Sequence, residues 1–399
     1  MIDNIVRKKT IKVNILLVLF LGALFIFGHN SNTVIYSNIL TLILFLYLIY
    51  RWMKQKLTIN KYSLLFIPFV MMLILGVLYS PESSYSIVIL TSLISCLILF
   101  FLIINTFDNK LSPSIYLSSI SVSGFLLSLY VLNYYGFNGL FTAIQSGERL
   151  GYEISQPNTI GYYLSISSLV TVAIIYDHWN KLSKLLLLII TFALVINIII
   201  IISTYSRSSV LILLIGFLIY LIMQKNFLKA IIFSLLTFSI ILLMTIYNNF
   251  NLDRFTDTFF LFDDSLVSAS DQVRQNLIAR GIELFSSNPI IGHGTGAFRY
   301  IYSEGILRLV ASHNNYIELL VNHGIIGFSL YYFPILVILL ANIKIYFKEK
   351  SNNTAIILVL VFVDIIVSGI SSYTYYRVLS YYILAIAIIN IIVYYKEKK

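Results

Sequence analysis

Charged residues are scarce in this sequence. Asp, Glu, Lys and Arg make up 11% of its 399 residues, whereas a soluble domain carries roughly 25%. Cysteine is almost absent, because Cys96 is the only one, and this excludes an intrachain disulfide. No internal repeat or low-complexity linker divides the chain. These absences exclude a soluble globular protein and predict a single membrane domain over residues 1–399.

Apolar residues fill the chain instead. They make up 59% of it, with a mean hydropathy of +0.90. Several continuous runs reach or approach the ~20 residues that a helix needs to cross a bilayer. We therefore predict an all-α, polytopic helical membrane protein with about twelve transmembrane helices. The predicted spans are approximately 13–28, 34–50, 62–79, 86–105, 114–135, 158–176, 185–203, 208–223, 230–247, 325–343, 354–370 and 376–395.

The basic residues predict the orientation. Lysines occur only in alternate loops and at the two ends of the chain, and short cytoplasmic loops are enriched in Lys and Arg. We therefore expect a multi-pass protein of the plasma (inner) membrane with both termini in the cytoplasm. Residues 248–324, between the ninth and tenth spans, then form one large extracytoplasmic loop. Loops of that length are uncommon unless they are functional, so we expect the site there.

Every basic residue on the predicted outer side is an arginine. Basic residues normally favour the cytoplasmic side, so arginines on the outer side need another explanation. The alternative for some of them is an ordinary solvated loop charge. Guanidinium groups bind phosphate through two parallel hydrogen bonds and stay charged when partly desolvated. An external site for a phosphorylated ligand is the natural inference. The eight outer arginines are Arg149, Arg207, Arg254, Arg274, Arg280, Arg299, Arg308 and Arg377.

The second half of the long loop contains two ordered motifs. Residues 273–285, VRQNLIARGIELF, have the spacing of a short amphipathic helix, with Arg274 at its start and Arg280 near its middle. Residues 286–298, SSNPIIGHGTGAF, then turn repeatedly on glycines, which let the backbone approach a ligand closely. His293 lies between two of these glycines and is a candidate site residue.

The stretch SHNNYIELLVNHGIIGF, residues 312–328, places a histidine at a predicted helix start. Asn315 and Glu318 have the spacing of a capping box, and Gly324 is expected to end the turn. His313 would then lie just before a helix N-terminus, which disfavours the imidazolium. A neutral imidazole is what a general base requires, although a loop histidine bonded to backbone fits the pattern as well. His323 is interpreted as structural.

These motifs resemble those of the O-antigen ligase and Wzy-type polysaccharide polymerase superfamily. The stretch 312–328 is similar to its His-Asn motif, and residues 274–298 to its arginine-led segment with a Pro-x-x-Gly-x-Gly turn. TYSRSSVLILLIG (204–216) resembles its Ser-Arg motif and places Arg207. SQPNTIGYYL (155–164) resembles its Pro-Asn segment and places Asn158.

The resemblance implies a GT-C-like helical fold and a metal-independent, cofactor-free glycosyltransferase. The enzyme would move a glycan from undecaprenyl diphosphate to a sugar hydroxyl on another lipid-linked unit. Arginines would stabilise the leaving diphosphate, and His313 would act as the base. The site residues are then expected to be Arg207 and Arg274 with His313 in catalysis, and Arg280, Asn314, Tyr316, His293 and Asn158 in substrate binding.

Two other functions stay open. A ligase would transfer a finished glycan to a different acceptor, whereas Asp364 inside the eleventh span suggests a lipid-glycan transporter. The composition rich in isoleucine, asparagine and lysine is typical of a low-GC genome, and a Gram-positive cell has no lipopolysaccharide core to ligate. We therefore expect a polymerase of capsule, exopolysaccharide or O-antigen repeat units. Its expected partners are the lipid-linked oligosaccharide, the bilayer, a flippase and a chain-length regulator, with no nucleic acid.

Overall fold

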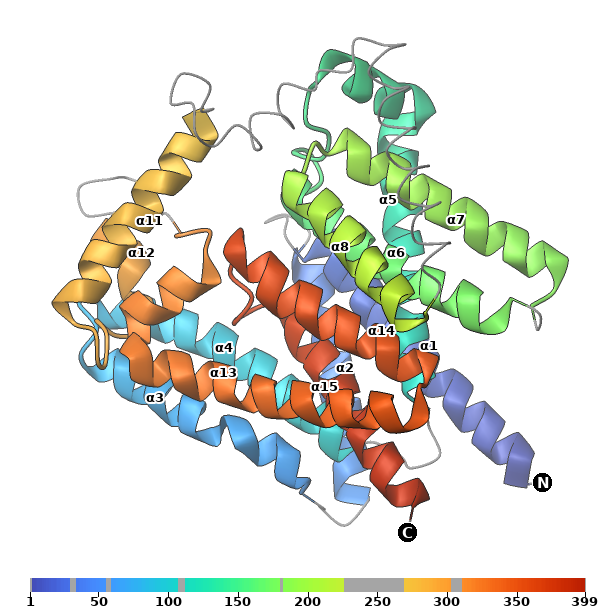
Figure 1. Cartoon of the computed structure of the whole chain (residues 1–399), viewed down its shortest axis with the longest axis horizontal. Helices are drawn as coiled ribbons and strands as arrows, with labels where there is room; N and C mark the ends of the chain where they lie inside the picture. The colour runs from blue at the N-terminus through green and yellow to red at the C-terminus, as the bar shows by residue number, and fades with distance from the viewer. Residues whose placement is uncertain are drawn as a thin grey trace. The chain divides into compact units, whose positions relative to one another are not determined.

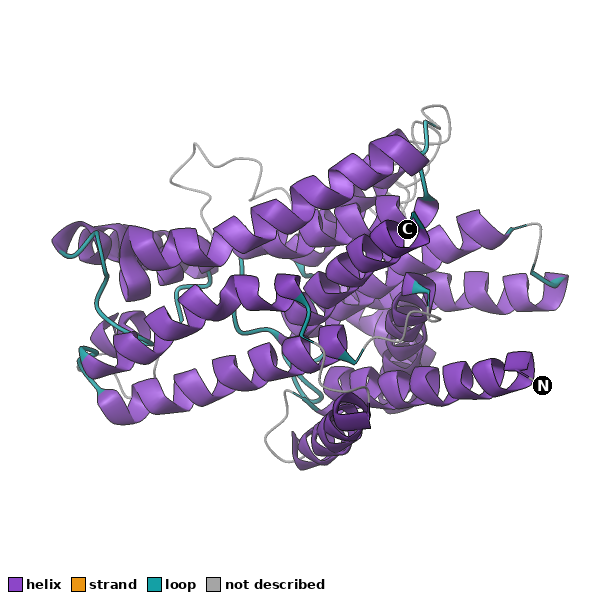
Figure 2. Cartoon of the chain, turned by 90° about the horizontal axis from the view of Figure 1, so that it is seen from below, coloured by secondary structure: helices purple, strands orange, loops and turns teal. Residues whose placement is uncertain are grey.

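The computed structural model describes residues 2–28, 34–54, 59–106, 112–179, 182–225, 269–302 and 311–398. Across these ranges the chain forms helices and connecting loops, without strands (Figure 2). The elements, labelled in Figure 1, are α1 (Ile2–Phe27), α2 (Val34–Lys54), η1 (Lys61–Phe66), α3 (Ile67–Leu78), α4 (Ser83–Asn105), α5 (Pro113–Ser146), α6 (Pro157–His178), α7 (Lys184–Ser203), α8 (Arg207–Met223), α11 (Ala269–Ser287), α12 (Ala297–Tyr302), α13 (Asn315–Glu349), α14 (Asn352–Val361), η2 (Phe362–Val367), η3 (Ser368–Ile370) and α15 (Val378–Glu397).

The predicted class, a polytopic helical membrane protein, is confirmed. Within the described ranges, nine helices are long and apolar enough to cross a membrane. Two shorter apolar helices, Ile15–Phe27 and Arg207–Met223, coincide with the predicted first and eighth spans. The predicted ninth span, 230–247, and the first part of the long loop lie outside the described residues. The number of spans and the orientation stay predictions.

The chain divides into two compact units that alternate along the sequence. The first consists of Met1–Tyr47, Asp108–Phe260 and Glu349–Leu360, and it includes α1 and α5 to α8. The second consists of Leu48–Phe107, Leu261–Lys348 and Val361–Lys399. It includes α3, α4, α11, α12, α13 and α15.

Small residues bring the helices of the first unit together. A Cβ atom on Gly124 of α5 would lie 1.9 Å from Ser167 Oγ of α6, so only glycine fits there. Ser128 donates a hydrogen bond to Asn197 of α7 (2.5 Å), and Asn197 Nδ2 lies 3.4 Å from the hydroxyl of Ser168. Such close approach and interhelical hydrogen bonding hold helices together in lipid, where apolar burial between helices contributes little.

The outward face of α7 shows the opposite pattern. Leu185 and Leu188 are 70% and 67% exposed. An apolar face of this kind suits a lipid environment and would be unfavourable in water. Helix α6, which contacts α5, α7 and α8, is buried over most of its length instead.

In the second unit, α4 packs against α3 and α15 (Figure 1). Asn105 at the end of α4 accepts a hydrogen bond from the N–H of Asn60 (2.5 Å) and donates to Ser63 Oγ (3.2 Å). Deeper in the unit, the ring of Phe100 packs edge-on against Phe66 (5.2 Å) and Tyr381 (6.0 Å). These contacts fix η1 and the start of α15 against α4.

A hydrophobic cluster holds α11 and α12 on the start of α13. Its buried members are Leu277 and Leu284 of α11, Phe298 of α12 and Val321 of α13. The amphipathic helix predicted at 273–285 is therefore confirmed, and its apolar face packs on this cluster. The described part of the predicted long loop is thus docked on α13, a candidate membrane span.

Helix α13 is broken at Gly324, as predicted, and the glycine turn 288–296 fills the break. Gly324 has φ of +60°. The carbonyls of Val321 and Asn322, on one side of the break, accept hydrogen bonds from His293 N (2.9 Å) and Gly294 N (2.8 Å). On the other side, Ile325 N and Ile326 N donate to the carbonyls of Pro289 (2.9 Å) and Ile290 (3.2 Å). The turn therefore satisfies backbone groups that the break leaves without helical partners.

Replacing Gly324 by alanine is expected to lower stability far more than replacing Gly136. Both glycines have positive φ (+60° and +64°) with ψ near 180°, a region essentially restricted to glycine, and a non-glycine residue there costs roughly 1–3 kcal/mol. At Gly324 the new Cβ would also lie 2.2 Å from Ile290 O, whereas at Gly136 it would meet nothing within 4 Å. Thermal unfolding in detergent measures the two losses of stability. Equal losses would contradict the tight packing of the glycine turn 288–296 into the break at Gly324.

Candidate active site

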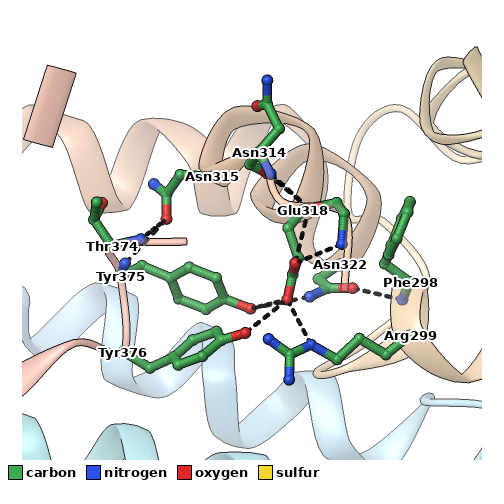
Figure 3. Close-up of polar contacts among 10 residues, drawn as sticks. Phe298, Arg299, Asn314, Asn315, Glu318, Asn322, Thr374, Tyr375 and Tyr376 are labelled. Carbon is green, nitrogen blue, oxygen red and sulfur yellow. Dashed lines mark hydrogen bonds and ion pairs between the residues drawn. The ribbon is translucent and has the colours of Figure 1, made fainter. Parts of the chain in front are cut away.

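Asn314 caps α13. Its Oδ1 accepts hydrogen bonds from the backbone N–H groups of Tyr316 (3.0 Å) and Ile317 (3.1 Å) in the first turn of the helix. Its Nδ2 donates to the carbonyl of Ile370 (3.2 Å). The predicted capping box between Asn315 and Glu318 is therefore wrong by one residue, because the cap lies one position earlier. The Asn314 amide points away from the Glu318 carboxylate (Figure 3).

Asn315 ties the helix to the loop that precedes α15, residues 371–377. Its Oδ1 accepts hydrogen bonds from the backbone N–H groups of Thr374 (2.7 Å) and Tyr375 (3.0 Å). Its Nδ2 donates to the hydroxyl of Tyr332 (2.8 Å). Because Asn315 is buried and these contacts occupy its amide, it serves as a clamp on the 371–377 loop.

Glu318 is the centre of a buried polar cluster (Figure 3). Its side chain is 1% exposed. The carboxylate accepts hydrogen bonds from Arg299 Nε (3.0 Å) and from the hydroxyls of Tyr376 (3.0 Å) and Tyr375 (3.5 Å). A buried carboxylate is stable only when charged and polar partners replace its water. These partners come from α12 and from the 371–377 loop, so the cluster joins three segments.

Arg299 is held by the same cluster. Its Cζ lies 4.7 Å from the ring centroid of Tyr373 and 4.9 Å from that of Tyr376, a cation–π arrangement. Burial by itself lowers the pKa of this guanidinium, but the carboxylate of Glu318 and the neighbouring tyrosines outweigh it, so that the pKa is raised. Arg299 therefore stays charged and supplies a fixed positive charge.

The turn that presents His313 is anchored on Glu318. Ser312 donates to Glu318 Oε2 through its hydroxyl (2.8 Å) and its backbone N–H (3.3 Å). The N–H of Asn314 in turn donates to Ser312 Oγ (3.1 Å). His313, between them, has φ of +53°, a conformation uncommon for non-glycine residues and one that can store strain at functional sites.

His313 has the electrostatics of a neutral histidine. Its ring is exposed at the surface, and its centroid lies 6.4 Å from that of Tyr373. Partial desolvation lowers the pKa of the imidazole; the positive charges of Arg274 and Arg299 lower it further, and Glu318 opposes them. Because the pKa lies below its usual value, the imidazole is uncharged at neutral pH and can accept a proton.

Arg274 and Arg280 occupy different environments on α11. Arg274 is half-buried, and its charge acts on His313. Arg280 is exposed and forms an ion pair with Glu283 one turn further along the helix (2.6 Å). Of the two predicted loop arginines, Arg274 is therefore the one whose charge reaches the candidate base.

His293 and Tyr316 have structural partners. His293 Nε2 lies 2.8 Å from the carbonyl of Leu284 and 3.1 Å from Ser287 Oγ, which fixes the turn to the end of α11. The hydroxyl of Tyr316 donates to the carbonyl of Ile366 (2.8 Å). A role for either side chain in substrate binding stays a prediction.

Arg207 and Asn158 belong to the first unit, whereas His313 and Arg274 belong to the second. Arg207 is the first residue of α8 and is half-buried. Asn158 lies in the first turn of α6, where its Oδ1 accepts a hydrogen bond from Arg149 Nη2 (2.5 Å). Arg149 Nε also donates to the carbonyl of Thr204. Among the described residues of the first unit, two of the predicted outer arginines, Arg149 and Arg207, therefore lie near the ends of its helices.

Asp364 is paired with an arginine. It lies in the π-helix η2 and is fully buried. Its Oδ1 is 3.8 Å from Arg377 Nη1, and Arg377 also donates to the hydroxyls of Ser368 (3.0 Å) and Ser372 (2.5 Å). The carboxylate that suggested a transport pathway is thus a counter-ion to Arg377, which is a simpler account of its burial.

Sequence reasoning missed most of the polar cluster. Arg299 was predicted only as one of the outer arginines, and Glu318 only as part of a cap. Tyr375 and Tyr376 were not singled out. One signal was present, because an acidic residue in an apolar helix is costly and marks a site by default. Applied to Glu318, that rule would have marked this residue as a site candidate without identifying its partners.

The described part of the chain brings no three His, Cys, Asp or Glu side chains together as a metal ion would require. No curated protein matches the sequence. The O-antigen ligase family model matches residues 192–332, which include α8, α11, α12 and the first part of α13. The match indicates an O-antigen ligase or polymerase type of function with glycosyltransferase-like activity. The match confirms the resemblance for the motifs at 204–216, 274–298 and 312–328, whereas the motif at 155–164 lies outside the matched residues.

Proposed function

We propose that this protein polymerises undecaprenyl-diphosphate-linked oligosaccharide repeat units at the extracytoplasmic face of the plasma membrane. The observation that supports this most is His313. It is an exposed, neutral imidazole at the start of α13, with the charge of Arg274 acting on it. A base beside a cation is what transfer from a diphosphate leaving group to a hydroxyl requires. The family match supports glycosyl transfer as the reaction class.

In the proposed reaction, a hydroxyl oxygen of the acceptor sugar attacks the anomeric carbon of the donor glycan. The bond from that carbon to the diphosphate oxygen breaks, and His313 takes the proton from the attacking hydroxyl. A direct displacement inverts the anomeric carbon. Negative charge grows on the departing lipid diphosphate, and Arg274 and Arg207 are assigned to stabilise it. Guanidinium groups bind phosphate oxygens through paired hydrogen bonds, so the proposed role needs no metal ion.

Proteoliposomes containing the purified protein and its undecaprenyl-diphosphate repeat unit test the proposal. A ladder of products on a glycan gel is expected, because a polymerase uses its own product as donor again. A single added unit, formed only when a different acceptor is supplied, would point to the ligase alternative. Absence of any new glycosidic bond would contradict glycosyl transfer. Movement of the lipid-linked unit without bond formation would support a transporter instead.

The pH dependence of transfer is expected to report the environment of His313. Protonation removes the base, so kcat/KM should fall on the acid side, with a midpoint below the ordinary histidine value of about 6.5. Arg274 is one cause of the lowered pKa. Arg274→Gln removes that positive charge and should raise the pKa of His313. The acid limb of the profile, where kcat/KM falls with falling pH, should then move to higher pH, and the rate should also be lower.

Arg280→Gln is the matched control for this measurement. Arg280 is on the same helix but is paired with Glu283. The acid limb of that variant should stay in place. A limb that moves equally in both variants would show that Arg274 does not act on His313, and an acid limb above the ordinary value in the wild type would contradict the lowered pKa.

A further inference from the structure

The 371–377 loop contains three tyrosines, and the polar cluster accounts for two of them. Tyr375 is fully buried, its hydroxyl lies near Glu318, and Asn322 Nδ2 donates to that hydroxyl (3.2 Å). Tyr376 donates to Glu318 (3.0 Å). Burial raises the pKa of Tyr375 far above its usual value, and the charge of Glu318 adds to this, so its hydroxyl keeps its proton. Both side chains therefore have structural roles.

Tyr373 differs from its two neighbours. Its ring is half-buried and stacks on the ring of Tyr376, with centroids 4.7 Å apart and an interplanar angle of 24°. The Arg299 guanidinium lies 4.7 Å from its centroid, and the His313 imidazole lies 6.4 Å away. Within the described part of the chain, the Tyr373 hydroxyl makes no hydrogen bond. A partly open aromatic ring with an unused hydroxyl thus lies beside the candidate base.

We propose that Tyr373 is the platform on which the acceptor sugar packs during transfer, an inference that rests on the proposed function. The acceptor hydroxyl has to come within hydrogen-bond reach of His313, so the acceptor ring must lie against the groups next to that imidazole. Tyr373 is an aromatic neighbour there. The positive C–H face of a sugar is attracted to the negative face of an aromatic ring, and the Tyr373 hydroxyl can bond a sugar hydroxyl.

The platform is fixed from both sides. On the C-terminal side, Asn315 clamps the backbone of Thr374 and Tyr375. On the N-terminal side, Ser372 Oγ accepts a hydrogen bond from Arg377 (2.5 Å). A side chain that orients a substrate has to be held in this way, because small displacements of a reacting group cost large factors in rate. These contacts on either side therefore set the position of Tyr373.

An acceptor titration with the reconstituted protein tests this role. The acceptor is the delipidated oligosaccharide repeat unit, added at increasing concentration to a fixed amount of lipid-linked donor. Tyr373→Ala should raise the acceptor KM roughly two- to tenfold, the range expected for losing one aromatic packing contact. Tyr373→Phe and Tyr373→Trp keep an aromatic ring and lose only the hydroxyl, so their acceptor KM should rise less than that of Tyr373→Ala. Tyr395→Ala, at the far end of α15, is the control. An unchanged acceptor KM in Tyr373→Ala would overturn the proposal.

A binding measurement separates this proposal from the proposed function. The emission of the Tyr373→Trp variant is followed while the same oligosaccharide is added, and Tyr395→Trp corrects for the native Trp52 and Trp179. A saturable change in Tyr373→Trp alone would support the platform even if the wild type forms no glycosidic bond. In that case the proposed function fails and the sugar site stands. No change in Tyr373→Trp would overturn the platform, whatever the activity.

Discussion

Replacing His313 is expected to lower the rate of glycosyl transfer by about 10²–10⁴-fold, the contribution typical of a general base. The imidazole is exposed and is not part of a packed core, so its removal should leave the fold intact. His313 has φ of +53°, a conformation that asparagine tolerates better than most residues. His313→Asn is therefore the sharper variant, and His313→Ala is its companion. The initial rate of product formation in proteoliposomes measures the loss.

His293 supplies the control for this experiment. It lies in the adjacent turn, where its ring nitrogen contacts Leu284 O and Ser287 Oγ. His293→Ala should lower thermal stability, and it should reduce the transfer rate of the folded protein far less than His313→Asn does. A His313→Asn variant with nearly full activity would remove His313 from the chemistry. A loss of activity only in His293→Ala would transfer the role to the glycine turn.

Removing the Glu318 carboxylate is expected to destabilise the protein by about 3–5 kcal/mol, because the change leaves a buried charge without its partner. Arg299 is 15% exposed and would lose the carboxylate 3.0 Å from its Nε. The hydroxyls of Tyr375 and Tyr376 would lose the same acceptor. We expect a large fall in the unfolding midpoint of Glu318→Ala, measured by thermal or denaturant unfolding in detergent.

A double-mutant cycle with Arg299→Met assigns this loss to the ion pair. Methionine removes the charge and keeps an unbranched apolar side chain. The double variant should be less destabilised than the sum of the two single variants, because no unpaired charge remains. Glu283→Ala breaks the exposed pair with Arg280 and should leave the unfolding midpoint nearly unchanged. Strictly additive single losses would contradict the buried pair.

Features that depend on neighbouring residues were predictable from the sequence. The predicted sixth and eighth spans begin within a residue of Pro157 and Arg207, where α6 and α8 start, and α11 ends at Ser287, just before Asn288 and Pro289. The break at Gly324 was predictable for the same reason. Proline, glycine and the spacing of apolar residues act over one or two helical turns, so the information is local.

The polar cluster was not predictable because its members are far apart in the chain. Glu318 meets Tyr375 and Tyr376, which follow it by 57 and 58 residues. Nothing in the local sequence distinguishes these two tyrosines from the many others. The same holds for Tyr373, whose neighbours Arg299 and His313 lie in other segments.

The cap of α13 depends both on local sequence and on contacts with a distant segment. Asn314 and Asn315 are equally good caps by composition, and the spacing to Glu318 favoured Asn315. In the folded protein the amide of Asn315 is taken by the backbone of Thr374 and Tyr375, so Asn314 caps the helix. Local sequence determined that a helix starts here with a histidine before it. Contacts with a segment almost sixty residues away decided which asparagine caps the helix, because only folding brings that segment within hydrogen-bonding distance.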